Sequence, residues 1–96
     1  MATVRTHRYT LAPDQVDKFL AQRGELIGQW RAAGLDLVDT RLYQLEDGTY
    51  LDIWHWASYE VMAKAFDSMN ELPLVGATLG MTSEHSAVDG DLVDER

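Results

Sequence analysis

A turn signal between two alternating apolar runs constrains the fold of this chain more than any other feature of its sequence. Residues 35–45 (LDLVDTRLYQL) and 49–60 (TYLDIWHWASYE) are rich in strand-forming side chains, and the tripeptide Glu46-Asp47-Gly48 separates them. Asp-Gly is a strong β-hairpin signal, because both residues tolerate the positive φ that the tight turn requires. The sequence therefore predicts two antiparallel strands joined at this turn.

A strand and a long helix are predicted before the hairpin. Residues 3–11 (TVRTHRYTL) have the composition and loose alternation of a strand. Pro13 suits a helix entry, and apolar side chains then recur at spacings of three and four through Trp30. We expect an amphipathic helix of about five turns, with Gly34 as its left-handed C-cap. Only Arg23 interrupts its apolar face.

The chain after the hairpin predicts a shorter helix and a last strand. Ser58 is a favourable N-cap for that helix. Its apolar side comprises Val61, Met62, Ala65, Phe66 and Met69. Leu72-Pro73 ends it, and residues 74–81 (LVGATLGM) predict irregular chain or a short extra helix. The last strand is expected over residues 83–88, before Asp89-Gly90 turns the chain into its acidic end.

The resulting order, β-α-β-β-α-β, is typical of a ferredoxin-like α+β fold, with both helices on one face of a four-stranded antiparallel sheet. We expect one domain over residues 1–88 and a solvated acidic tail over residues 89–96. The second face of the sheet would expose apolar side chains. A small domain buries little apolar surface, so leaving this face exposed would remove much of its stabilisation. We therefore expect a homodimer that packs sheet to sheet, a dimeric α+β barrel.

Composition excludes several classes of function. The chain carries 16 acidic and 8 basic residues, a net charge of −8, which argues against binding of a nucleic-acid backbone. It has no cysteine, so disulfides, thiolate nucleophiles and Cys-ligated zinc are excluded. No apolar run approaches the ~20 residues of a membrane span. The first residues lack the apolar segment of a signal peptide, and we expect a cytoplasmic protein.

Two short motifs extend the pattern: LAPDQ (11–15) at the end of the first strand and HWASYE (55–60) at the end of the third. With the long amphipathic helix between them, the chain resembles the antibiotic-biosynthesis monooxygenase-like family of dimeric α+β barrels over nearly its whole length. This resemblance implies a cofactor-independent monooxygenase that acts on a planar aromatic, polyketide-type molecule, with neither a metal nor an organic cofactor.

The family also contains haem-degrading enzymes, whose pocket holds an Asn on the first strand, a Trp on the third strand and a His ligand on the second helix. In this sequence the Asn position falls on His7 and the Trp position on Trp56. The His position falls near Ala65 or Phe66, and neither can bind iron. The usual haem ligation is therefore not expected.

Strand alternation gives the candidate pocket. Alternate side chains of the third strand share one face, and the resemblance implies that Trp56 faces the helices. On the first strand, His7 shares its face with Arg5 and Tyr9. Such a lining suits the stacking of a planar ring. The predicted substrate-binding residues are Tyr9, Arg23, Tyr50, Trp54, Trp56 and Phe66. The alternative is that Trp54 and Trp56 are core residues only.

Asp52 is the most specific signal on that face. An ionised, unpaired carboxylate beneath the helices costs several kcal/mol, so it needs a partner. The candidates are Arg5, Arg8, Arg23, Arg41 and His7. Arg23 is attractive because it interrupts an apolar stripe, although a side chain reaching into water would explain it equally. We predict His7 and Asp52 as the catalytic residues: one of them accepts a proton from a phenolic or enolic substrate, whose carbanion then reacts with oxygen.

Other interpretations remain open from the residues alone. His7, His55 and His85 lie on three predicted strands, but His55 alternates to the opposite face from His7, so no metal site is predicted. A non-catalytic dimeric barrel, small-ligand-binding or stress-related, could use the same pocket, as could a non-oxidative polyketide cyclase.

Overall fold

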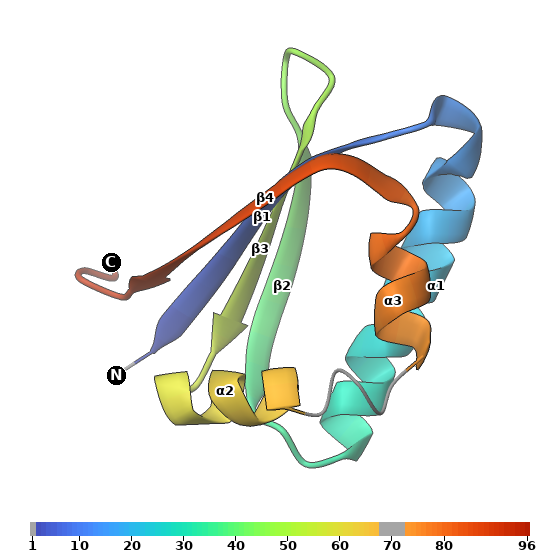
Figure 1. Cartoon of the computed structure of the whole chain (residues 1–96). Coiled ribbons are helices and arrows are strands. Elements are labelled where there is room, and N and C mark those ends of the chain that lie inside the picture. The colour runs from blue at the N-terminus through green and yellow to red at the C-terminus, as the bar shows by residue number, and fades with distance from the viewer. Residues whose placement is uncertain (1, 68–72) are drawn as a thin grey trace.

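The computed structural model describes residues 2–67 and 73–96. Within them the predicted ferredoxin-like α+β fold is confirmed (Figure 1), and the sheet has the order β2-β3-β1-β4 with antiparallel pairing throughout. The elements are β1 (Thr3–Leu11), the 3-10 turn η1 (Pro13–Gln15), α1 (Val16–Ala32), β2 (Leu37–Gln44), β3 (Tyr50–Trp56), α2 (Tyr59–Asp67), α3 (Pro73–Leu79) and β4 (Thr82–Asp91).

The helices lie on one side of the sheet. In Figure 1, α1 and α3 run side by side, and α2 lies across one end of the strands. None of the described helices is long and apolar enough to cross a membrane.

The β2–β3 hairpin forms where the sequence predicts it. Gly48 has φ +85°, and its N–H donates to the Leu45 carbonyl at 2.9 Å. The Asp47 carboxylate accepts from the backbone N–H of Thr49 at 3.0 Å. The local chemistry of the turn thus sets the register of the two strands that carry the aromatic run.

Helix α1 is closed as predicted by Gly34, which follows its last residue Ala32 by two positions and has φ +81°. The Gly34 N–H donates to the Arg31 carbonyl, and the Leu35 N–H reaches back to that of Trp30. Its apolar stripe is narrower than the sequence pattern suggests: Phe19, Leu26 and Trp30 are buried, whereas Leu20 is 46% exposed.

The C-terminal third differs most from expectation. Residues 73–79 form the short helix α3, which was one of two predicted possibilities. Strand β4 continues to Asp91, beyond the predicted end at Val88, because Asp89 and Gly90 pair with Arg5 and Val4 instead of turning. The predicted positions of Met69 and Leu72 lie outside the described residues.

The two ends of the chain meet along β1 and β4. Thr3 pairs with Asp91, and the backbone N–H of Leu92 donates to the Ala2 carbonyl at 2.9 Å. Residues 92–96 follow outside any helix or strand.

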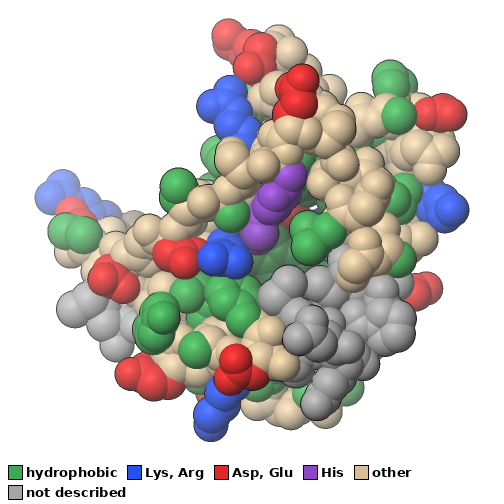
Figure 2. Space-filling model, viewed as in Figure 1, with side chains coloured by type: hydrophobic (Ala, Val, Ile, Leu, Met, Phe, Trp, Pro, Cys, Tyr) green, Lys and Arg blue, Asp and Glu red, His purple; other side chains and the backbone are tan. Residues whose placement is uncertain are grey.

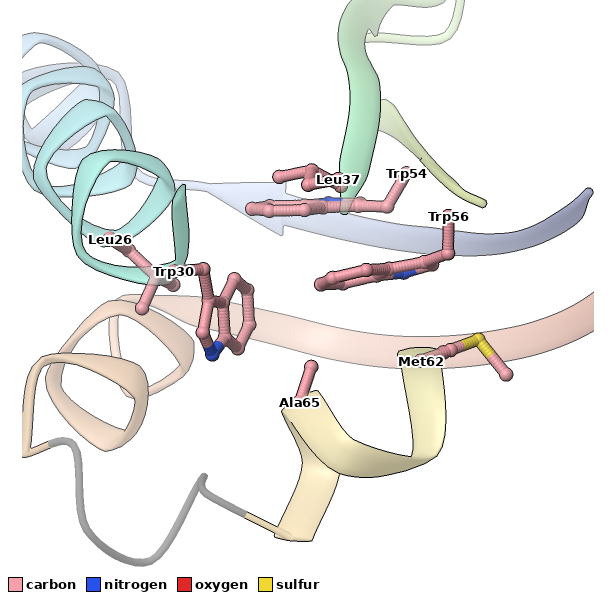
Figure 3. Packing of buried hydrophobic residues seen from close by; sticks show 7 residues of the cluster. All are labelled: Leu26, Trp30, Leu37, Trp54, Trp56, Met62 and Ala65. Atoms are coloured by element: carbon pink, nitrogen blue, oxygen red, sulfur yellow. The ribbon is translucent and has the colours of Figure 1, made fainter. Parts of the chain in front are cut away.

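The hydrophobic core lies between the helices and the centre of the sheet. Trp30 of α1 meets Trp54 and Trp56 of β3 edge-on (Figure 3). The ring centroids are 5.5 Å apart in both pairs. Trp54 and Trp56 lie nearly parallel, 6.5 Å apart. The cluster is completed by Leu26, Leu37, Met62 and Ala65.

The opposite face of the sheet, which we call the open face, is covered by none of the described helices. Pairing places Val4 beside His55 and Thr6 beside both Ile53 and Val88 on this face. Val88 is 69% exposed. The open face therefore combines apolar and polar side chains without a covering layer.

Candidate functional site

A cavity lies between the helix-facing side of the sheet and the three α-helices. About 600 Å³ of this region, counting the solvent at its open mouth, is free of protein atoms. The centre of a water molecule could occupy a volume of only about 60 Å³ inside the cavity, so its interior is a narrow slot. In Figure 2 the histidines visible on this face lie beside a hollow whose floor is apolar. The lining residues are Arg5, His7, Tyr9, Phe19, Arg23, Leu26, Trp30, Asp52, Trp54, Trp56, Phe66, Thr78, Leu79 and Thr82.

Asp52 is buried in the wall of this cavity, and Arg23 is its partner. The Arg23 guanidinium donates from Nη2 to Oδ1 at 2.7 Å and from Nε to Oδ2 at 3.1 Å. The Tyr9 hydroxyl donates to the same Oδ2 at 2.8 Å. Of the five partners proposed from the sequence, the one that interrupts the apolar stripe of α1 makes this bidentate pair.

The surroundings of Asp52 keep Tyr9 protonated. Burial raises the pKa of the Tyr9 hydroxyl well above its ordinary value, and the neighbouring Asp52 carboxylate raises it further. Tyr9 therefore acts as a hydrogen-bond donor at all physiological pH values. Both oxygens of Asp52 are occupied by these donors.

His7 lies beside this network, directly opposite Asp52 in the β1–β3 register. Burial lowers the pKa of His7 to about 4, and the proximity of His85 contributes in the same direction. Its Nδ1 is 2.8 Å from Nε2 of His85. In the tautomer whose Nδ1 donates to His85, Nε2 of His7 carries the free lone pair and can accept a proton.

A bulge in β4 lies next to His85, whose side chain contacts that of His7 although the strand partner of His7 is Ala87. The β1–β4 register shifts between Arg8 and Thr10, and Glu84 adopts φ +54°. The His85 ring stacks near Tyr9, with centroids 6.1 Å apart.

His55 lies on the open face, where its Nδ1 contacts Asp39 Oδ1 at 2.7 Å, so strand alternation separates it from His7 as predicted. The described part of the chain contains no group of three His, Asp or Glu side chains arranged to hold a metal ion.

The aromatic residues of β3 serve both as core and as cavity wall. Trp54 and Trp56 are 7% and 1% exposed, belong to the core cluster, and line the cavity. The Arg23 guanidinium lies over the Trp54 ring at 5.1 Å from its centroid. The two sequence-based alternatives, core and pocket, therefore describe the same side chains.

Phe66 and Tyr50, both predicted to bind substrate, lie at different places relative to the cavity. Phe66 of α2 lines the cavity, with the Arg5 guanidinium 4.1 Å above its ring. Tyr50 was predicted to bind substrate but is not part of the lining. It lies at the hairpin end of β3, 6.3 Å from the Tyr9 ring, because alternation fixes the face of a strand and not the distance along it.

Several lining residues were missing from the predicted site. Arg5 shares the His7 face of β1, and Trp30 belongs to the apolar stripe of α1, so both carried a signal in the sequence. Thr78 and Leu79 come from α3, whose sequence gave no firm helical pattern.

No protein-family model matches the sequence, and no curated protein matches it. Solved structures do. A crystal structure of an antibiotic biosynthesis monooxygenase is 18% identical, with a TM-score of 0.71, covering 98% of this chain and 100% of that one. SnoaB, a cofactor-independent oxygenase from Streptomyces nogalater, is 14% identical, with a TM-score of 0.78 and coverage of 98% and 95%.

A dimeric ferredoxin-like protein from an uncultured marine organism is 14% identical, with a TM-score of 0.73 and coverage of 99% and 90%. At these identities the likeness is one of fold. The chain has the fold of the antibiotic biosynthesis monooxygenases over nearly its whole length.

Proposed function

Since the chain has this fold, we propose that it is a cofactor-independent monooxygenase acting on a planar aromatic, polyketide-type molecule. One observation carries the proposal: a slot walled by the indoles of Trp30, Trp54 and Trp56 places an uncharged histidine, His7, beside the space where a flat ring would stack. SnoaB, a fold neighbour, is described as a cofactor-independent oxygenase, which supports the same class of chemistry.

In the proposed reaction, Nε2 of His7 takes a proton from a phenolic or enolic substrate. The carbanion form of the substrate adds O₂ to give a peroxide anion, which takes the proton back from His7. The resulting hydroperoxide loses water, so that a ring CH₂ and one O₂ become a ring C=O and H₂O. We assign the proton transfer to His7 because the Asp52 oxygens are engaged by Arg23 and Tyr9. Asp52 then has a positioning role.

Oxygen uptake with a panel of anthrone-type phenols tests this function. The wild-type chain should consume one O₂ per quinone formed, and His7→Ala should lower the rate by ~10²-fold or more. His55→Ala, on the open face, is the matched control and should leave the rate unchanged. An absence of uptake, or an unchanged rate in His7→Ala, would contradict the proposal.

The low pKa of His7 favours a second candidate function. A base with a pKa of about 4 drives proton abstraction weakly, so the same slot would also suit a module that binds a small apolar ligand without turnover. Quenching of tryptophan fluorescence by a ligand that emerges chemically unchanged would favour this second function.

We also propose a homodimer that buries the open face. Val88 and Ile53, which lie on either side of Thr6 on the open face, are apolar positions that a second sheet would cover. One neighbour of the same fold is described as dimeric.

A further inference from the structure

His85 links His7 to solvent. Its Nε2 lies 2.8 Å from Nδ1 of His7, and the two ring centroids are 5.0 Å apart. His7 is half-buried and lines the cavity, whereas His85 is exposed on β4 and is not part of the lining. In Figure 2 histidine side chains reach the surface beside the hollow. A single hydrogen bond therefore joins the cavity wall to water.

The position of His85 on β4 explains this contact. The strand partner of His7 is Ala87, two positions beyond His85. Alternate residues of a strand share a face, so His85 lies on the face of His7 and meets it diagonally. The bulge at Glu84, with φ +54°, lies directly before His85. Such backbone conformations cost free energy in residues other than glycine, and they cluster at functional sites.

A positive charge on His7 is unfavourable at this place. Burial lowers the pKa of His7 to about 4, and the proximity of His85 acts in the same direction. Proton abstraction that left the charge on His7 would therefore carry the cost of its desolvation. A charge on the exposed His85 would instead keep its hydration.

We propose that His85 is a proton relay for His7, so that the charge created by proton abstraction resides on His85 and not in the cavity wall. Nε2 of His7 takes the substrate proton while the Nδ1 proton of His7 passes to Nε2 of His85. One N–H bond of His7 forms and one breaks, so His7 stays neutral and His85 becomes the imidazolium. When the peroxide anion takes the Nε2 proton of His7, the Nε2 proton of His85 returns to Nδ1 of His7.

This inference rests on the proposed function, because it concerns the proton transfer assigned to His7. His85 acts through His7 and is therefore a positioning residue. The relay requires that both rings carry their proton on Nδ1 at rest, so that Nε2 of each can accept one.

The tautomer of His7 can be determined without any substrate. Long-range ¹H–¹⁵N spectra at neutral pH distinguish a protonated ring nitrogen from an unprotonated one. The wild type should show His7 protonated on Nδ1 and unprotonated on Nε2. His85→Gln should keep this tautomer, because the amide oxygen can accept from Nδ1. A wild-type His7 ring with its proton on Nε2 would overturn the relay.

The proton transfer itself can be measured without oxygen. The CH₂ protons of anthrone exchange for deuterium when a base abstracts them, and NMR in D₂O under nitrogen follows this exchange above its rate in buffer. His85→Gln should lower the catalysed rate about tenfold, because glutamine accepts the hydrogen bond but cannot take up the proton. His85→Ala should be at least as slow, and imidazole in solution should restore its rate. His55→Gln, on the open face, is the matched control and should exchange as fast as the wild type.

The outcomes separate the relay from the proposed function. If His85→Gln matches the wild type, or if imidazole leaves His85→Ala slow, His85 only orients His7 and the relay is overturned. If the wild type catalyses no exchange, the relay is also overturned, and oxygen uptake alone then decides the proposed function. If exchange depends on His85 but no anthrone gives oxygen uptake, the oxygenase proposal fails and the relay stands.

Discussion

Arg23 on α1 and Asp52 on β3 form a bidentate ion pair, with 2.7 and 3.1 Å between donor and acceptor atoms. The Arg23 side chain is 12% exposed and that of Asp52 is 4% exposed. The pair is therefore largely removed from water, where its geometry matters far more than at a surface. It also holds a helix to the sheet at the wall of the cavity.

Replacing Arg23 with Met should destabilise the fold by about 3–5 kcal/mol, because it leaves the Asp52 carboxylate buried without its counter-charge. The free energy of unfolding from urea titration measures the effect. The matched control is Arg8→Met, which breaks the exposed Arg8–Asp47 pair and should cost less than about 1 kcal/mol.

The double variant Arg23→Met with Asp52→Leu should recover most of that loss, because two apolar side chains can replace a buried ion pair at little cost. Equal losses in Arg23→Met and in the double variant would show that packing of the Arg23 stem, and not its charge, stabilises the contact.

Tyr9→Phe should cost about 1.5–3 kcal/mol of unfolding free energy, the usual value for a hydrogen bond to a charged group. The ring stays buried against Phe19 and only the donor to Asp52 is lost. Tyr59→Phe, at a hydroxyl-bearing ring that is 60% exposed, should change stability by less than about 0.5 kcal/mol. Indistinguishable effects of the two substitutions would contradict the Tyr9–Asp52 bond.

His7 should make the free energy of unfolding depend on pH between about 4 and 6.5. The lower value is the pKa of His7 in the folded protein, and the upper value is the ordinary pKa of histidine, which applies to the unfolded chain. In that interval the unfolded chain binds more protons than the folded one, so the His7 contribution to stability falls as pH falls. Below pH 4 this contribution is constant. The charged and titratable groups around His7 are His85, Asp52, Arg5 and Asp89.

The ring signals of His7 in an NMR titration check this directly and should not move until the pH approaches 4. His85→Gln removes a neighbour that lowers the pKa of His7 and should shift the His7 midpoint upward. A wild-type His7 midpoint near 6.5 would disprove the burial argument.

Ile53→Lys should dissociate the proposed dimer, because a buried ammonium at the centre of the open face would lack a counter-charge. Sedimentation equilibrium should give twice the chain mass of 10.8 kDa for the wild type and the single mass for the variant. Leu20→Lys, at a 46% exposed position on α1, is the control and should remain dimeric. A wild type that sediments as a monomer at micromolar concentration would refute the interface.

Local chemistry explains which parts of the fold the sequence predicts. The Asp47-Gly48 turn and the Gly34 cap depend on backbone conformations that few residues adopt, so both are readable. Asp89-Gly90 carries the same kind of signal, but Arg5 binds Asp89 across the strands, and pairing prevails over the turn. Local preference yields there to a tertiary contact.

In the candidate site, too, some features follow from the local sequence and others depend on tertiary contacts. Strand alternation places Asp52 beneath the helices, and the break in the α1 stripe makes Arg23 an attractive candidate among five possible partners, but the contact itself selects Arg23. The position of Tyr50 outside the cavity depends on where the helices end above the sheet, which no local pattern encodes. The side-chain contact between His85 and His7 depends on the bulge at Glu84, whose φ of +54° is uncommon for that residue type.

The hydrogen bond between Leu92 and Ala2 has a consequence for engineering. Because the two chain ends lie side by side, residues 93–96 could act as a natural linker from the old C-terminus to the old N-terminus. New ends opened in the turn at Asp47-Gly48 would give a circular permutant that keeps every strand intact. In that rearranged chain the two strands carrying His7 and His85 would become neighbours in sequence as well as in space.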